Sequence, residues 1–105
     1  MINPKFCGML GLAMRAGKLV CGEAKTSEAI RSGKCFLLLL AADASENTEK
    51  KFKNMTKFYS VSALVPGNRI ELGSILGKDS VVSAAVTDEG FAKQIRALYN
   101  SEKQQ

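Results

Sequence analysis

Histidine is absent from this chain of 105 residues, and the absence limits the chemistry that the chain can perform. Without an imidazole there is no Ser-His or Cys-His pair to activate a nucleophile, although lysine and carboxylate bases stay open to it. Most acidic residues lie near expected helix ends, where capping and the helix dipole account for them. They are Asp43, Glu46, Glu49, Asp79, Asp88 and Glu89. We therefore expect no enzyme and no catalytic residue.

Cysteine is also scarce and is poorly spaced for metal or redox chemistry. Cys7, Cys21 and Cys35 are odd in number, widely separated and flanked by apolar residues, and no Cys-x-x-Cys pair occurs. A disulfide framework needs an even set of cysteines, and structural zinc sites need paired ligands. We expect three reduced thiols that pack in the interior, no metal and no cofactor.

The sequence has no long apolar run and no nucleotide-binding motif. No hydrophobic stretch approaches the ~18 residues of a membrane span, and the start, MINPKF, lacks the features of a secretory signal. Neither GxGxxG nor a Walker A pattern is present. The Gly-Lys pairs at Gly17, Gly33 and Gly77 are more typical of helix ends followed by an exposed lysine. These absences favour a cytoplasmic protein, which we expect to be a monomer.

What is present is an excess of positive charge on a chain of ordinary domain size. Fifteen Lys and Arg against ten Asp and Glu give a net charge of +5, and 46% of the residues are hydrophobic. This bias favours an anionic partner, and the length favours a single domain. We expect that domain to cover residues 1–99, followed by a polar tail over residues 100–105.

The hydrophobic pattern alternates between helix-like and strand-like segments. Helices are expected over 4–16, 23–32, 48–59, 69–76 and 88–99, and strands over 19–21, 35–42, 61–65 and 81–86. The run 35–42, CFLLLLAA, is long and apolar enough to be a central strand covered on both faces. The pattern therefore predicts the α/β class, as a three-layer α/β/α sandwich around a small four-stranded sheet.

The stretch from Leu12 to Lys34 concentrates the basic residues. It holds Arg15, Lys18, Lys25, Arg31 and Lys34, three glycines and only two acids. Gly22 stands before an expected helix, where free backbone N–H groups can bind an anion; a tight turn that needs glycine explains it equally well. The lysines at 50, 51, 53 and 57 are more typical of a solvated helix face.

Several separated motifs resemble one family in their order along nearly the whole chain. They are GLAMRAGKLVCGEAKTSEAIRSGK, LLLLAADAS, VPGNRIELGSILGKD and AVTDEGFAKQI. The chain resembles the ribosomal L7Ae/L30e family, in its small bacterial YlxQ-like branch. The resemblance implies a mixed four-stranded sheet, no enzymatic activity, and binding to kink-turn RNA, a sharply bent helix with tandem sheared G·A pairs.

The resemblance also implies which segments contact RNA. They are the turn and helix start from Gly22 to Glu28, and the apolar loop from Leu64 to Gly67 with the two residues after it. A flipped base can lie against such a loop while basic residues hold phosphates. The candidate RNA-binding residues are Lys18, Gly22, Glu23, Lys25, Thr26, Arg31, Lys34, Val65, Pro66, Gly67, Asn68 and Arg69.

The chain departs from the family at three positions that read bases. Kink-turn binders of this family commonly have Asn-Glu and a later Lys, where this chain has Ala24, Lys25 and Glu28. Ala24 has no hydrogen-bonding side chain, and Lys25 donates but cannot accept. We hypothesise that Glu23 supplies the acceptor. A protein-interaction module that has lost kink-turn specificity is the alternative, and a small enzyme or nucleotide binder is the least favoured one.

Overall fold

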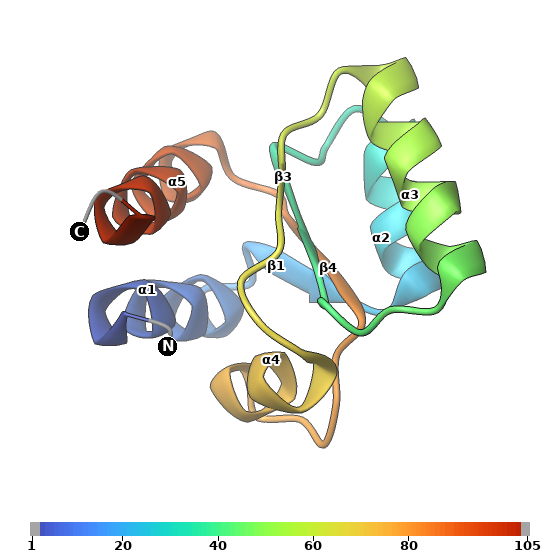
Figure 1. The fold of residues 1–105 in the computed structure, drawn as a ribbon. Helices are drawn as coiled ribbons and strands as arrows, with labels where there is room; N and C mark the ends of the chain where they lie inside the picture. Colours follow the sequence, from blue (N-terminus) through green and yellow to red (C-terminus); the bar gives the residue numbers. More distant parts are fainter. Residues whose placement is uncertain (1–2, 104–105) are drawn as a thin grey trace.

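The computed structural model describes residues 3–103, and their helices and strands alternate along the chain (Figure 1). Side chains are described for residues 3–101. The elements are α1 (Pro4–Arg15), β1 (Leu19–Cys21), α2 (Glu23–Arg31), β2 (Leu37–Leu40), α3 (Glu46–Tyr59), β3 (Ala63–Leu64), α4 (Arg69–Leu76), β4 (Ser83–Val86) and α5 (Glu89–Lys103).

Local capping chemistry sets the helix boundaries, as the sequence predicts. The Asn3 side chain accepts a hydrogen bond from the Lys5 N–H at 2.8 Å at the start of α1. Asn68 and Glu71 form a reciprocal capping box at the start of α4, and Gly77 ends that helix in the left-handed region. The expected helix starts are therefore confirmed to within a residue or two.

Some element ends differ from the expected ones. The apolar run 35–42 contributes only Leu37–Leu40 to the ladder of β2, and β3 keeps two of the five residues expected at 61–65. Hydrophobicity marks burial, whereas a strand ends where its pairing partner ends. Helix α5 extends to Lys103, so residues 100–103 of the expected tail are helical, and residues 104–105 lie outside the described part.

The four strands described form one mixed sheet in the order β1-β4-β2-β3. Strand β4 pairs antiparallel with both β1 and β2, and β2 pairs parallel with β3. In the register, Leu38 of β2 lies opposite Ala85 of β4 on one side and Ala63 of β3 on the other. The predicted fold class is confirmed.

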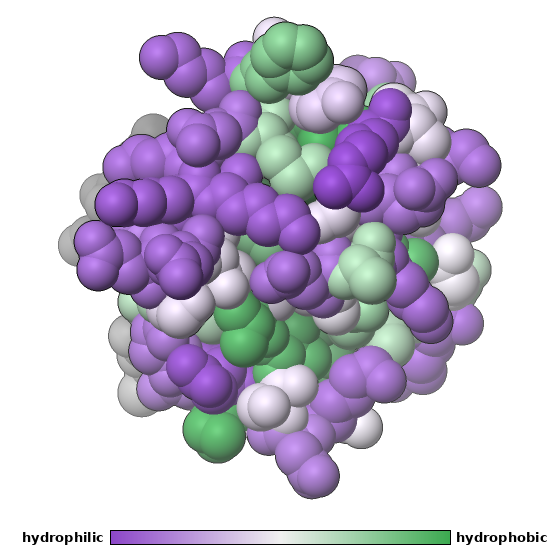
Figure 2. Space-filling model, turned by 90° about the vertical axis from the view of Figure 1, so that its right-hand side faces the viewer, coloured by the Kyte–Doolittle hydropathy of each residue, from purple (hydrophilic) through white to green (hydrophobic). Residues whose placement is uncertain are grey.

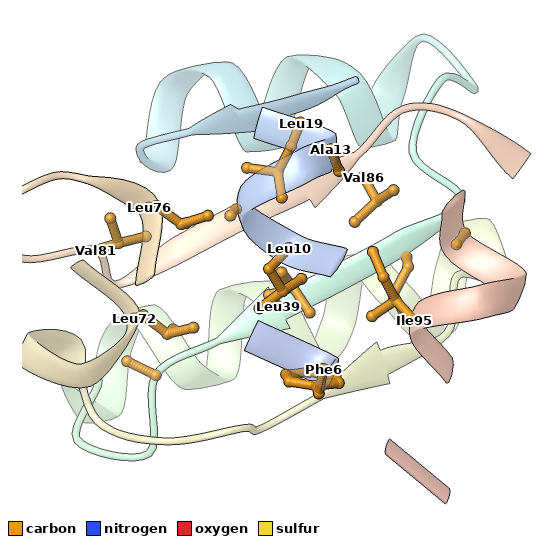
Figure 3. Close-up of a cluster of buried hydrophobic side chains, with 14 residues drawn as sticks. Phe6, Leu10, Ala13, Leu19, Leu39, Leu72, Leu76, Val81, Val86 and Ile95 are labelled. Carbon is orange, nitrogen blue, oxygen red and sulfur yellow. The ribbon is translucent and has the colours of Figure 1, made fainter. Parts of the chain in front are cut away.

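Helices cover both faces of this sheet, and β2 supplies side chains to both cores. Leu37 and Leu39 pack with α1, α4 and α5, while Leu38 and Leu40 pack with α2 and α3 (Figure 1). The larger cluster places Phe6 and Leu10 of α1 over Leu39, between α4 and α5 (Figure 3). Both β2 faces are thus removed from water, which explains its unbroken leucine run.

The sheet topology gathers four connections at one end. Because β4 runs against β1 and β2, while β3 runs with β2, the segments that follow β1, β2 and β3 lie at the same end as the segment before β4. Backbone hydrogen bonds join them: the Gly22 N–H donates to Ser83 O at 2.9 Å, and the Ala42 N–H donates to Gly67 O at 2.8 Å. We call this the loop end of the sheet.

Cys7, Cys21 and Cys35 form no disulfide within the described residues, and burial raises the pKa of Cys35 to about 11, so this thiol stays protonated at neutral pH. Within residues 3–103, none of the helices has the length and apolar character needed to cross a bilayer.

Gly73 in α4 allows the chain after the helix to pass close to it, and its substitution tests that contact. A Cβ at this position would lie 2.7 Å from Lys78 O and 2.7 Å from Ser80 Cα, and both are backbone atoms. We expect Gly73→Ala to lower the free energy of unfolding by about 1–3 kcal/mol, measured by urea denaturation.

Gly8→Ala is the matched control, because a Cβ there has nothing within 4 Å. Gly8 lies inside α1, so this variant should gain up to about 1 kcal/mol from helix propensity. Equal stability of the two variants would contradict the close approach at Gly73.

Candidate nucleic-acid interface

The turn at Gly22 leaves the N-terminus of α2 open. Gly22 has φ 101° and ψ 151°, a conformation that favours glycine, and it provides no side-chain cap. The first backbone bond of the helix runs from the Thr26 N–H to Gly22 O. The amides of residues 23–25 precede that bond and are the donors that an anion can use.

The other helices of residues 3–103 begin differently. At the start of each one, a side-chain oxygen accepts a hydrogen bond from a first-turn N–H; these oxygens belong to Asn3, Ser45, Asn68 and Asp88. Such caps satisfy donors that would otherwise need water or a ligand. Among these helices, α2 is therefore the one with an uncapped N-terminus, and it lies at the loop end.

The apolar loop after β3 lies at the same end. Val65 is 49% exposed, and it borders a hollow of about 400 Å³ whose apolar lining includes Leu40, Ala41, Ala42 and Phe52. The face formed by α2 and α3 shows apolar surface within its lower half, surrounded by hydrophilic residues (Figure 2). A planar apolar group, such as a nucleobase, suits this loop and hollow.

Asp43 and Arg69 hold the loop in place. The Asp43 carboxylate accepts from the Arg69 backbone N–H at 2.8 Å and from Arg69 Nε at 3.2 Å, while Arg69 Nη2 donates to Asp43 O at 2.8 Å. The bond from the Arg69 backbone N–H, helped by the guanidinium charge, lowers the pKa of Asp43 below its ordinary value. Arg69, expected to hold a phosphate, is thus engaged in positioning the Pro66 loop.

Glu23 is oriented toward α3. Its carboxylate pairs with Lys51 Nζ at 3.1 Å and accepts a long hydrogen bond of 3.5 Å from Thr48 Oγ1. The pair is about half exposed, so its contribution to stability is small, ~0–1 kcal/mol. A ligand that hydrogen-bonds to Glu23 therefore competes with Lys51 for the same carboxylate.

Lys78 is a basic residue of the loop end that our candidate set leaves out. It lines a hollow of about 390 Å³ beneath the turn, together with Gly22, Ser80 and Ser83, and the buried Ser83 hydroxyl has no hydrogen-bond partner among residues 3–101. Burial raises the pKa of Cys21, and the nearby charges of Lys78 and Lys25 oppose that rise.

The omission of Lys78 has a simple cause. Lys78 and Gly22 are far apart in sequence, and only the antiparallel pairing of β1 with β4 brings them together. The one signal in the sequence is the Gly-Lys pair itself, which places a lysine on a loop.

The structure divides the basic residues of the candidate set. Lys25 lies on the first turn of α2, at the loop end. Lys18 precedes β1, and its backbone carbonyl oxygen accepts from the Thr87 N–H at 2.8 Å; Arg31 ends α2, and Lys34 lies between α2 and β2. These three residues lie toward the opposite end of the sheet from the Gly22 turn, although Lys34 and Lys25 line one hollow along α2.

The side chain of Thr26, a candidate RNA-binding residue, lies in the interior. Its side chain is 0% exposed, and that of Ser27 is 2% exposed. Neither hydroxyl has a hydrogen-bond partner among residues 3–101. Both small side chains lie on the buried face of α2, which packs against β4. Gly22, Lys25, Val65 and Asn68 are exposed; Pro66 and Gly67 are partly exposed.

An uncapped helix N-terminus and an exposed apolar loop, both at one end of a mixed sheet between two helical layers, define a class of small α/β/α domain. Residues 5–96 match the model of the ribosomal protein L7Ae/L30e/S12e/Gadd45 family, and the chain belongs to that family. The resemblance seen in the sequence is thereby confirmed.

Similar proteins carry names of two kinds. The chain is 42% identical over 94 residues to the RNA-binding protein YlxQ of Enterococcus faecium, which covers 90% of each chain. It is 34% identical to the large ribosomal subunit protein eL30 of Branchiostoma belcheri, over 90% of this chain and 84% of that one. A solved structure of a Bacillus halodurans protein of unknown function matches with a TM-score of 0.88 and 36% identity, covering 93% of this chain and 99% of the other.

Asp43→Ala tests the contact that positions the loop. Because the pKa of Asp43 is lower in the folded chain, its ionised form stabilises the fold above the unfolded-state pKa of about 3.9, and this contribution disappears as pH falls through the folded-state value. At pH 7 we expect a lower urea midpoint for the variant than for the parent protein.

Below the folded-state pKa, the two urea midpoints should converge. Asp79→Ala, which changes an exposed aspartate of the α4–β4 connection, is the control. A midpoint difference that stays constant from pH 7 to pH 2 would contradict the role of the Asp43 charge.

Proposed function

We propose that the chain binds structured RNA of the kink-turn type without catalysing a reaction, in the cytoplasm, as a ribosomal-protein-like or ribosome-associated protein. The observation that carries the proposal is that the uncapped N-terminus of α2 and the exposed Val65 loop lie at the same end of the sheet. Family membership and the names of the relatives support RNA as the ligand.

The two contact segments suit the two features of a kinked RNA. The backbone amides of residues 23–25, with Lys25 and Lys78 nearby, are donors and positive charges for phosphates. The loop at Val65 and Pro66 offers apolar contact to a base that the kink turns out of its stack. A straight A-form duplex presents no such base, so preference for a kinked RNA follows from the loop.

The side chains of Ala24 and Lys25 cannot accept a hydrogen bond from a base, so another group must do so. Ala24 offers only its backbone N–H, and Lys25 can donate to a phosphate or to a purine acceptor. Glu23 is the nearest carboxylate able to accept from a guanine amino group. In this proposal Glu23 exchanges its bond to Lys51 for one to the base.

Charge neutralisation at the loop end gives the first test. We expect Lys25→Gln and Lys78→Gln each to weaken binding to a kink-turn RNA in fluorescence anisotropy titrations. Each should also reduce the slope of log K against log salt by ~0.7 to 0.9, because one phosphate contact is lost. Lys93→Gln, an equal charge change on exposed α5, is the matched control and should leave the slope unchanged.

Two outcomes would overturn the proposal. One is equal affinity of the parent protein for a kink-turn RNA and for a straight duplex of the same composition. The other is a pull-down from cell lysate in which protein partners stay bound after RNase treatment and no RNA is bound. That result would favour the protein-interaction module.

Glu23→Gln tests the base-reading role. The amide can no longer offer two charged acceptor oxygens, so we expect weaker binding to the kink-turn RNA at fixed salt. Glu28→Gln is the matched control: it makes the same charge change on the exposed side of α2, and by removing a negative charge it should leave affinity equal or slightly higher. If Glu23→Gln binds as tightly as the parent protein, Glu23 is not the acceptor.

A further inference from the structure

A pair of aromatic side chains is exposed at the C-terminal end of α3, away from the loop end. Phe58 is 81% exposed and Tyr59 is 41% exposed, and their ring centroids lie 4.9 Å apart at an interplanar angle of 77°. Phe58 is more exposed than any other large hydrophobic side chain of residues 3–101. Figure 2 shows hydrophobic surface projecting at the upper edge of this face, with hydrophilic residues around it.

The aromatic pair borders a hollow between α2 and α3. The hollow measures about 450 Å³ and is lined by Arg31, Lys51, Asn54, Met55, Phe58 and Tyr59. Its lining contains two cations and no carboxylate. Arg31 has no acidic partner among residues 3–101, whereas Lys51 pairs with Glu23. We call these six residues the aromatic hollow.

These side chains are of the types that bind the bases and phosphates of a single-stranded nucleic acid. Aromatic faces stack on bases without regard to sequence, and arginine adds both phosphate contact and stacking. The Asn54 amide can donate to and accept from a base edge. An apolar peptide would have to bury the Arg31 charge, which a phosphate instead neutralises.

We propose that the aromatic hollow is a second RNA contact, which binds a single-stranded segment with a base stacked on Phe58 and a phosphate on Arg31. The inference builds on the proposed function, since the same RNA would be held at the loop end. Helices α2 and α3 run side by side in the same direction, with Glu23 beside Lys51 and Arg31 beside Phe58. From Lys51 to Phe58 the rise along α3 is only ~10 Å, so one RNA can contact both surfaces.

The second contact would involve basic residues that lie outside the loop end. Arg31 lies at the opposite end of the sheet from the Gly22 turn, and Lys57 precedes Phe58 on the solvent-facing part of α3. A flanking strand that leaves a kinked helix and passes over α3 would meet both.

Binding of an unstructured RNA tests the aromatic hollow alone. The probe is a ~12-nucleotide CA-repeat RNA, which has neither a kink-turn nor a hairpin. We expect Phe58→Ala to weaken binding of this probe about fivefold to a hundredfold, the loss typical of one stacked base, and Arg31→Gln to weaken it and reduce its salt dependence. The matched controls are Leu12→Ala, on the opposite helical layer, and Lys93→Gln; both should bind like the parent protein.

The fluorescence of Tyr59 gives a second measurement of binding at the aromatic hollow. The chain has no tryptophan and two tyrosines, so in a Tyr99→Phe background the emission comes from Tyr59. We expect the CA-repeat RNA to quench this emission. Phe58 and Leu12 are both exposed, so we expect neither substitution to disturb the core. Circular dichroism verifies that each variant retains its fold.

The outcomes separate this inference from the proposed function. If Phe58→Ala and Arg31→Gln bind the CA-repeat RNA like the parent protein, the second contact is refuted and the exposed pair is left as a surface for a protein. A kink-turn RNA without single-stranded ends should lose affinity with Lys25→Gln but not with Phe58→Ala. If neither variant lost affinity for this kink-turn RNA, the site at the loop end would be refuted instead.

Discussion

The structure depends on the burial of one strand, β2, from both sides. Its four leucines alternate between two cores, and each core anchors a separate layer of helices. Leu37, Leu38 and Leu39 are at most 1% exposed, so each removes its whole side chain from water, at about 1.5–3 kcal/mol per residue. A polar side chain in this run would be buried without a hydrogen-bond partner in one of the two cores and would destabilise the fold. The position of α2, and with it the open helix N-terminus, is therefore set by the interior rather than by surface contacts.

The loop end is assembled from segments that are far apart in the sequence, and polar contacts between them fix its shape. Asp43 binds Arg69 through both backbone and side chain, and Gly22 and Gly67 are each tied to a neighbouring strand end by a backbone hydrogen bond. A kinked RNA would meet a surface whose loops are already ordered. Preorganisation of this kind lowers the entropy lost on binding.

The sequence was sufficient for the order of the helices and strands and for the fold class, because these follow from local rules, whereas the order of the strands in the sheet does not. Caps at Asn3 and Asn68, the helix stop at Gly77 and the apolar run after Gly33 each specify their element without knowledge of the rest. The candidate site could be predicted only in part, since Gly22 and the Pro66 loop carry local signals. The engagement of Arg69 with Asp43, the burial of Thr26 and the position of Lys78 depend on which chain ends the sheet brings together. No pattern within a single segment encodes those contacts.

The pair between Glu23 and Lys51 connects the two surfaces that we assign to RNA. Glu23 lies on the open first turn of α2, where an unpaired carboxylate would repel a phosphate, and Lys51 lines the aromatic hollow. In the free protein each charge neutralises the other, at the low energy typical of exposed pairs. A ligand with a base at Glu23 and a phosphate near Lys51 replaces one ion pair by two contacts, so the exchange need not weaken binding. The same pair makes the two surfaces interdependent, because a substitution at either residue releases the charge of the other.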